Sequence, residues 1–382
     1  MSAGTSFISS GWGSNGPTDW RFILGGLIAS RAALTLVGLI ATLVLHEPNR
    51  HLELLPDFGA LEMWAQWDAE HYVDIAVDGY SYTPGTYSNV PFFPLFPWLI
   101  RLVAMPFGPL NQQAAALAGL VIANVALFIA LLYLAALVAR DMSLSVARRT
   151  VVYILVFPTT LFLSSVYAES LFLATATASL YHARQGEWYR AGLAGGLAAL
   201  TRPYGFLLVV TLALEMFRQR APTRAWPAVA IVPAGLAIYL GYLWVQFGDP
   251  LLYFKANQVW GRGFHWPWET MLNYIRGPLV GFDWPYSWLD LLSMLAMVTI
   301  LVVARRRVPL SYSAYTAVGL LFALSTGVAW FSASRHALAL FPVIIMLASL
   351  GERRAIGWPW LILSTVLAIG FMARVAIGYW VA

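Results

Sequence analysis

Long apolar runs, separated by short stretches that carry arginine, dominate the chain from residue 22 onward. An apolar run of about 20 residues is long enough to cross a bilayer as a helix. The pattern predicts spanning helices over 22–45, 112–139, 226–247, 288–304, 310–330, 337–350 and 356–380. No internal repeat or low-complexity linker interrupts it, so one integral-membrane domain over 1–382 is predicted.

Two further apolar intervals, 150–183 and 191–217, predict helical hairpins. Polar residues and a proline lie near the middle of each, which places the hairpin tips near 164–169 and 201–204. A single tilted helix in either interval is the alternative, and it would reverse the orientation of everything downstream. With the hairpins, the chain is an all-α polytopic membrane protein of about eleven transmembrane helices, within a range of nine to thirteen.

Composition agrees with a membrane protein, since 60% of residues are hydrophobic, 11% are charged and the mean hydropathy is +0.69. The net charge of +5 does not indicate nucleic-acid binding, because the basic residues are scattered between apolar runs. The chain has no cysteine, which excludes disulfides, thiolate metal sites and a cysteine nucleophile. Its first residues show no cleavable signal, so the first apolar run is predicted to stay as a span.

Arginine clusters set the expected orientation, because short cytoplasmic loops carry an excess of Lys and Arg. The clusters are Arg140/Arg148/Arg149, Arg184/Arg190, Arg218/Arg220/Arg224, Arg305/Arg306/Arg307 and Arg353/Arg354. With all five inside, 46–93 becomes a large first external loop with short amphipathic helices, and 248–287 an external aromatic loop. Both hairpin tips and the residues just before 337–350 then face outward as well. Five polar segments are thus predicted to converge on one external face.

The segment 64–97 concentrates charge in an otherwise apolar chain. If Trp64 to Ile75 is helical, Asp68 and His71 lie on one face by their i, i+3 spacing. A carboxylate there could deprotonate a hydroxyl nucleophile while cationic side chains stabilise a phosphate leaving group. This inventory suits glycosyl transfer from a lipid-phosphate sugar, which needs no second carboxylic acid.

Blander interpretations stay open for several of these side chains. Glu169 could form a purely structural ion pair with Arg202 or Arg335. His71 could serve only as a hydrogen-bonding or packing residue. The acidic segment matches neither the HExxH nor the DxDxDG pattern, so no metal ligands are predicted and no cofactor is expected.

Four blocks of sequence resemble the PIG-V family, whose members add the second mannose to glycosylphosphatidylinositol precursors. They are QWDAEHYVDIAVDGY with the following FFPLFP, FPTTLFLSSVYAESLFL, GGLAALTRPYGFLL, and SASRHALALFP. They occur in order, and the combination is specific although a single block such as TRPYG is weak. The resemblance implies a GT-C glycosyltransferase fold and the use of a polyprenyl-phosphate sugar.

The resemblance also implies roles for individual residues. Asp68, in the WD pair, would be the catalytic base, and Glu70 and His71 would contact the acceptor or orient Asp68. Arg202 and Arg335 match positions suited to the donor phosphate. The remaining predicted substrate-binding residues are Glu169, Lys255, Gln258, Trp260 and His336. His336 stands where the family commonly has tyrosine, which puts its role in doubt, and Lys255 could instead be a residue that snorkels to the interface.

These features predict an inverting mannosyltransferase that moves mannose from polyprenyl-phosphate mannose to a hydroxyl of a membrane glycolipid or glycan, giving an α-mannoside. The chain is rich in Ala and Arg and has one Lys, which is typical of a bacterial protein, here one of the inner membrane. The arginine clusters place its site on the extracytoplasmic side, and a monomer is expected. A transporter or flippase of lipid-linked sugars is the alternative, and a noncatalytic subunit is a weaker one. Mannose itself rests on the resemblance.

Overall fold

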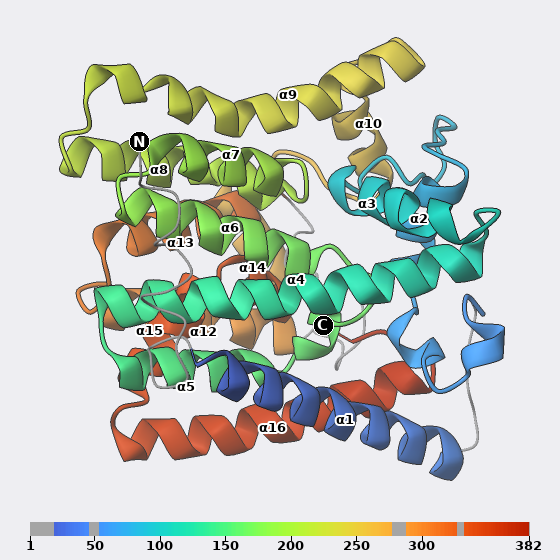
Figure 1. Cartoon of the computed structure of the whole chain (residues 1–382), viewed down its shortest axis with the longest axis horizontal. Coiled ribbons are helices and arrows are strands. Elements are labelled where there is room, and N and C mark those ends of the chain that lie inside the picture. Colours follow the sequence, from blue (N-terminus) through green and yellow to red (C-terminus); the bar gives the residue numbers. More distant parts are fainter. Residues whose placement is uncertain (1–18, 46–52, 277–287, 327–331, 382) are drawn as a thin grey trace.

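A computed structural model describes residues 19–45, 53–276, 288–326 and 332–381, and every regular element in these ranges is a helix (Figure 1). The α-helices are α1 (Trp20–Val44), α2 (Ala69–Val77), α3 (Leu95–Ala104), α4 (Gln112–Asp141), α5 (Leu144–Leu155), α6 (Glu169–Arg184), α7 (Trp188–Ala199), α8 (Leu208–Arg218), α9 (Pro227–Phe247), α10 (Leu252–Val259), α11 (Pro267–Arg276), α12 (Trp288–Ala304), α13 (Leu310–Leu324), α14 (Ala333–Ala339), α15 (Pro342–Leu350) and α16 (Arg354–Ala376). Short 3-10 helices include η2 (Glu62–Trp64), η4 (Thr160–Leu163) and η5 (Pro203–Leu207).

The predicted apolar runs all contain helices, and both predicted hairpins are present. The first consists of α5 and α6 and the second of α7 and α8, with tips at residues 156–168 and 200–207. Polar side chains start several helices: Asp19, Asn111 and Ser143 accept backbone N–H bonds at the starts of α1, α4 and α5.

Two predicted elements differ from the structure. The helix expected from Trp64 to Ile75 begins only at Ala69, because Trp67 has a φ of 61° and interrupts the helical path after η2. The run predicted at 337–350 is divided into α14 and α15, whose axes differ by 93°. Parts of the predicted loops and of the 310–330 span, namely 46–52, 277–287 and 327–330, lie outside the described residues, as do residues 1–18.

Four helices in the described ranges are long and apolar enough to cross a membrane, namely α1, α4, α9 with the turn before it, and α16. The bent pair α14–α15 meets the same criteria as one broken span, and α12 and α13 are shorter apolar helices. The chain is therefore a multi-pass membrane protein.

The long helices run side by side along the longest dimension of the molecule (Figure 1). α1 packs against α16, α4 against α6, and α7 against α9. The contact between α7 and α9 is close because glycines face it: a Cβ at Gly235 would overlap the backbone of Gly196. Small residues at helix contacts let backbones approach in this way.

Segments of the first loop and the α9–α10 corner gather at one end of the bundle, at the right of Figure 1. Apolar side chains join them into a cluster of their own: Ile75, Tyr80, Val90, Phe93, Leu200, Tyr239, Leu243, Leu252 and Ala256. Tyr239 reinforces it by donating a hydrogen bond from its hydroxyl to the carbonyl of Val90. This packing ties the first loop and α2 to α9 and α10.

Candidate active site

Asp68 lies at the turn that precedes α2, and its backbone is held by a tyrosine from the first hairpin. The Asp68 N–H donates to the Tyr167 hydroxyl at 3.1 Å, and that hydroxyl donates to the carbonyl of Gln66 at 3.0 Å. Tyr167 therefore binds the groups on both sides of Trp67, the residue with a left-handed backbone. Such a conformation costs about 1–3 kcal/mol and persists only where surrounding contacts enforce it.

Arg335 is brought to Asp68 by the short helix α14. Its Nη1 lies 2.8 Å from Asp68 Oδ2, across 267 positions of sequence. The guanidinium also lies 4.7 Å from the ring centroids of both Phe162 and Tyr167, so it packs against two neighbouring aromatic rings. At the start of α14, Asp290 accepts a hydrogen bond from the Ala333 N–H at 2.7 Å.

Glu169 is the first residue of α6, and it contacts two arginines that lie far apart in the sequence. Its side chain is 1% exposed, and its Oε1 contacts both Arg335 Nε and Arg202 Nη1. The sequence left open which arginine would pair with Glu169, and in the structure both do. Removing one member of such a buried set leaves an uncompensated charge, which costs about 3–5 kcal/mol.

Arg202 and the residues after it come from the break between α7 and η5. Arg202 has an extended backbone there, and Pro203 starts η5. Gly205 packs directly on α7, where a Cβ would overlap the backbone of Ala198 and Ala199. Tyr204, which no sequence pattern singled out, places its hydroxyl 3.1 Å from His336 Nδ1. The TRPYG segment thus serves to bring Arg202 and Tyr204 against α14.

The other residues predicted from the first loop lie beside this cluster. The His71 ring packs against Phe92 and Trp260, with centroid separations of 4.4 and 5.9 Å. Glu70 is exposed, and Trp260 is half-buried. His71 therefore packs against two aromatic rings, and its predicted contact with the acceptor stays a prediction.

Lys255 and Gln258 lie on α10 and point to the surface. The Lys255 Nζ is 2.6 Å from Asp249 Oδ2, and its side chain is 60% exposed. This hydrogen bond raises the pKa of Lys255 and lowers that of Asp249. Gln258 is exposed. The structure does not bring either residue to Asp68, because α10 presents Ala256 and Asn257 to the interior instead.

Asp68, Glu169, Arg202, Arg335 and His336 are therefore the predicted residues that meet in one place. Tyr167 and Tyr204 are the residues that sequence reasoning missed as site members. Both belong to the motifs YAES and TRPYG, but a tyrosine beside apolar residues carries no signal of its own that it belongs to a site. In the described part of the chain, no three or more His, Asp or Glu side chains are grouped so that they could hold a metal ion.

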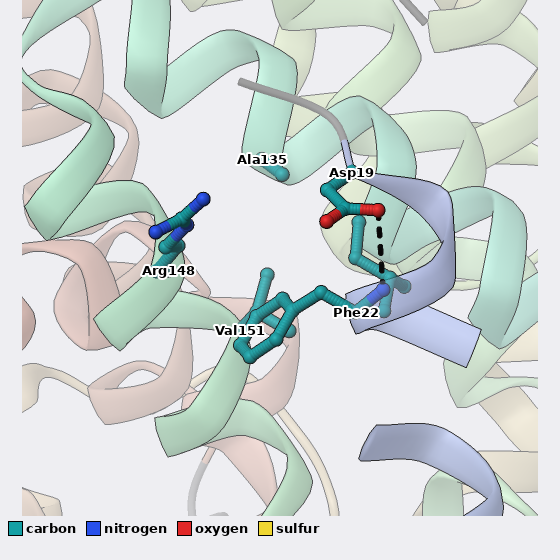
Figure 2. A pocket seen from close by; sticks show the side chains of 6 residues that line it. Asp19, Phe22, Ala135, Arg148 and Val151 are labelled. Carbon is teal, nitrogen blue, oxygen red and sulfur yellow. Dashed lines mark hydrogen bonds between the residues drawn. The ribbon is translucent and has the colours of Figure 1, made fainter. Parts of the chain in front are cut away.

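A small cavity lies at the far end of the bundle and is separate from this cluster. It is lined by Asp19, Phe22, Ile23, Ala135, Arg148 and Val151. Figure 2 shows Arg148 across the cavity from Asp19, whose carboxylate accepts the N–H of Phe22. These residues come from the start of α1, from α4 (Ala135) and from α5 (Arg148 and Val151). None of the predicted site residues lines it.

Comparisons with known proteins identify relatives for part of the chain. Residues 57–220 match the family described as Mannosyltransferase (PIG-V). The GPI alpha-1,6-mannosyltransferase 2 of Mus musculus is 30% identical over 159 residues, which cover 39% of this chain and 31% of the mouse protein. The protein of the same name from Rattus norvegicus is 29% identical over 151 residues, or 38% of this chain and 30% of the rat protein. The chain thus matches less than a third of the length of these relatives.

Among solved structures, ArnT from Cupriavidus metallidurans, crystallised in the apo state, has a similar fold. The TM-score is 0.50 at 14% sequence identity, and the match covers 92% of this chain and 64% of ArnT. At this identity the similarity concerns the fold alone. This similarity agrees with the GT-C-like fold that the family resemblance implied. The predicted resemblance to the PIG-V family is confirmed separately, by the family match over residues 57–220.

Proposed function

The chain resembles the PIG-V mannosyltransferases over residues 57–220, and from this premise we propose that it is an inverting mannosyltransferase with Asp68 as its base. The observation that carries the proposal is the state of the Asp68 side chain. Oδ2 is bound by Arg335, and among the described residues Oδ1 has no hydrogen-bond partner. With 23% of the side chain exposed, Oδ1 can accept a proton from a bound hydroxyl.

In the proposed reaction, residues of the cluster accept the proton and stabilise the leaving group. Asp68 Oδ1 takes the proton of the acceptor hydroxyl as its oxygen attacks the anomeric carbon of mannose. The bond from that carbon to the phosphate oxygen breaks on the opposite face, and the lipid phosphate leaves with the electron pair. A β-linked donor therefore yields an α-mannoside. Arg202 and Arg335 are the proposed cations beside the departing phosphate, and Glu169 holds both in place.

The donor and acceptor follow from the family resemblance. We propose polyprenyl-phosphate mannose as the donor, since a donor activated by phosphate needs only a base and cations from the protein. The proposed acceptor is a hydroxyl of a membrane glycolipid or glycan. Glu70, His71, Trp260 and His336 are proposed to line the sugar and acceptor region around Asp68.

The membrane arrangement that we propose has eleven crossings. The four long helices, the bent pair α14–α15 and the six shorter helices α5, α6, α7, α8, α12 and α13 supply them. The arginine-bearing turns face the cytoplasm and the Asp68 cluster faces outward, in a bacterial inner membrane. A single domain and a monomeric state complete this proposal.

A transfer assay tests the proposal directly. Purified protein is given radiolabelled polyprenyl-phosphate mannose and a mixed lipid extract, and transfer into lipid is measured with and without a chelator. Asp68→Asn keeps the shape of the side chain but removes the base, so transfer should fall by about 100- to 10,000-fold. Asp78→Asn is the control, because Asp78 is exposed at the end of the same helix.

A wild-type rate of transfer in Asp68→Asn would show that Asp68 is not the base. Transfer that requires a divalent metal would contradict the mechanism. Uptake of the labelled lipid across a vesicle membrane without any new glycoside would instead support a flippase. Mass spectrometry of the product identifies the sugar and the acceptor.

A further inference from the structure

The arginines at the candidate site are already occupied by carboxylates. Arg335 contacts both Asp68 and Glu169, and Arg202 contacts Glu169. Two guanidinium groups thus face two carboxylates, and these four groups together carry no net charge. A phosphate-linked lipid brings at least one negative charge. The four groups alone leave that charge uncompensated, so a further cation is needed to bind it well.

Arg262 lies on a short segment that passes close to this cluster. The segment is attached at one side by Trp260, whose ring packs against His71. It is attached at the other side by His265, whose N–H donates to the carbonyl of Ser325 at the end of α13, at 2.9 Å. Gly261 turns the chain between them with a φ of 69°, a conformation that glycine adopts freely. These two contacts hold the segment that carries Arg262 between α2 and the end of α13.

The Arg262 guanidinium interacts electrostatically with groups at the centre of the site. Tyr253, Asp68, Arg335 and Arg202 lie near enough for their charges to act on the Arg262 guanidinium. It also acts on Tyr204 and His336, the pair formed by η5 and α14. Arg262 therefore lies near three segments of the cluster: the turn before α2, η5 and α14.

Two further observations describe a cation available to a ligand. Arg262 is exposed to solvent, yet protein surrounds it so closely that desolvation lowers the pKa of its guanidinium. Among the described residues, no carboxylate lies within ion-pair distance of it, in contrast to Arg202, Arg335 and Lys255. An unpaired guanidinium in such surroundings gains much from an anionic partner.

We infer that Arg262 binds the phosphate of a lipid-linked sugar donor and keeps hold of that phosphate after the sugar has left. The inference rests on the proposed transfer reaction and assigns the main phosphate contact within it. The donor phosphate is a diester with one negative charge, and the departing lipid phosphate is a monoester with up to two. The planar guanidinium can hold two phosphate oxygens at once, and its charge matters more as the bond to mannose breaks.

The experiment measures binding separately from transfer. Polyprenyl phosphate without a sugar is titrated into the full-length protein in nanodiscs, and its dissociation constant is determined for wild type, Arg262→Gln, Arg262→Lys and Arg306→Gln. Arg306 is an exposed guanidinium in the turn between α12 and α13, away from the site. A dolichol-type alcohol without phosphate is titrated in parallel.

We expect Arg262→Gln to bind polyprenyl phosphate about 10- to 100-fold more weakly than wild type. Arg262→Lys should recover part of the loss, because it keeps the charge and loses the planar fork. Arg306→Gln should match wild type, and the alcohol should bind all four proteins equally. In the transfer assay, the KM for the donor should rise in Arg262→Gln.

Equal binding of polyprenyl phosphate by wild type and Arg262→Gln would overturn the inference, even if wild type transfers mannose normally. Equal loss for the phosphate and the alcohol would also overturn it, because it would reflect a damaged fold. Binding that depends on Arg262 in a protein that transfers no sugar would leave the phosphate site standing and remove the proposed function.

Discussion

Replacing Tyr167 by phenylalanine should slow mannosyl transfer without unfolding the protein. The change removes the hydroxyl that binds the Gln66 carbonyl and the Asp68 N–H at 3.0 and 3.1 Å, and it keeps the ring on which Arg335 lies. The two hydrogen bonds together contribute about 1–3 kcal/mol. The left-handed conformation of Trp67 costs about the same amount.

Because these energies nearly balance, the turn before Asp68 is expected to relax once the hydroxyl is lost. If this relaxation raises the activation free energy by about 1.4 kcal/mol, the rate falls about tenfold. We therefore expect kcat/KM for polyprenyl-phosphate mannose to fall by about 5- to 100-fold in Tyr167→Phe. The assay is initial-rate transfer in detergent, with a thermal melt of the same preparation.

Tyr80→Phe is the matched control, since it also removes a buried hydroxyl that donates to a carbonyl, that of Phe92 at 2.6 Å. It should lower the melting temperature and leave kcat/KM near the wild-type value. The effect of Tyr167→Phe should also shrink in a Trp67→Gly background, because glycine adopts this backbone conformation without strain. Equal fold-losses in both backgrounds, or a wild-type rate in Tyr167→Phe, would refute the reasoning.

Two further predictions concern the fold and its orientation. Gly205→Ala should destabilise the protein by about 1–3 kcal/mol, because the new Cβ would overlap the backbone of Ala198 and Ala199. Gly241→Ala in α9, where a Cβ meets open space, should be neutral or stabilising, and equal melting temperatures for the two variants would contradict this account. In the cysteine-free chain, Ser81→Cys should react with an impermeant thiol reagent only from outside the cell and Arg306→Cys only from inside; the reverse pattern would show that the orientation drawn from the arginines is wrong.

Much of the secondary structure could be predicted because it depends on local pattern. The apolar runs that begin near 112 and 226 became α4 and α9 almost residue for residue. The two hairpins were also predicted, because prolines and polar residues interrupt apolar intervals that are short for two full crossings. In a bilayer the backbone must satisfy its own hydrogen bonds, so an apolar run has few options besides a helix.

Local sequence pattern predicted the structure less well where contacts with distant segments decide it. The predicted helix from Trp64 starts at Ala69, since Tyr167, about a hundred positions away, holds the turn at Trp67 and Asp68. Lys255 was expected near the substrate, but in the structure it pairs at the surface with Asp249, six positions earlier. Arg262, seven positions after Lys255, is the cation of this segment that we propose for the donor phosphate.

The sequence by itself determined that the protein is helical, membrane-spanning and similar to the PIG-V family, and it singled out Asp68 as the carboxylate of interest. Only the tertiary structure decided the partners of that carboxylate. It showed that Arg335 reaches both Asp68 and Glu169, that Arg202 shares Glu169, and that Arg262 has no carboxylate partner among the described residues. Helices form from hydrophobic periodicity within a few turns of chain, whereas ion pairs between segments hundreds of positions apart depend on how those helices pack.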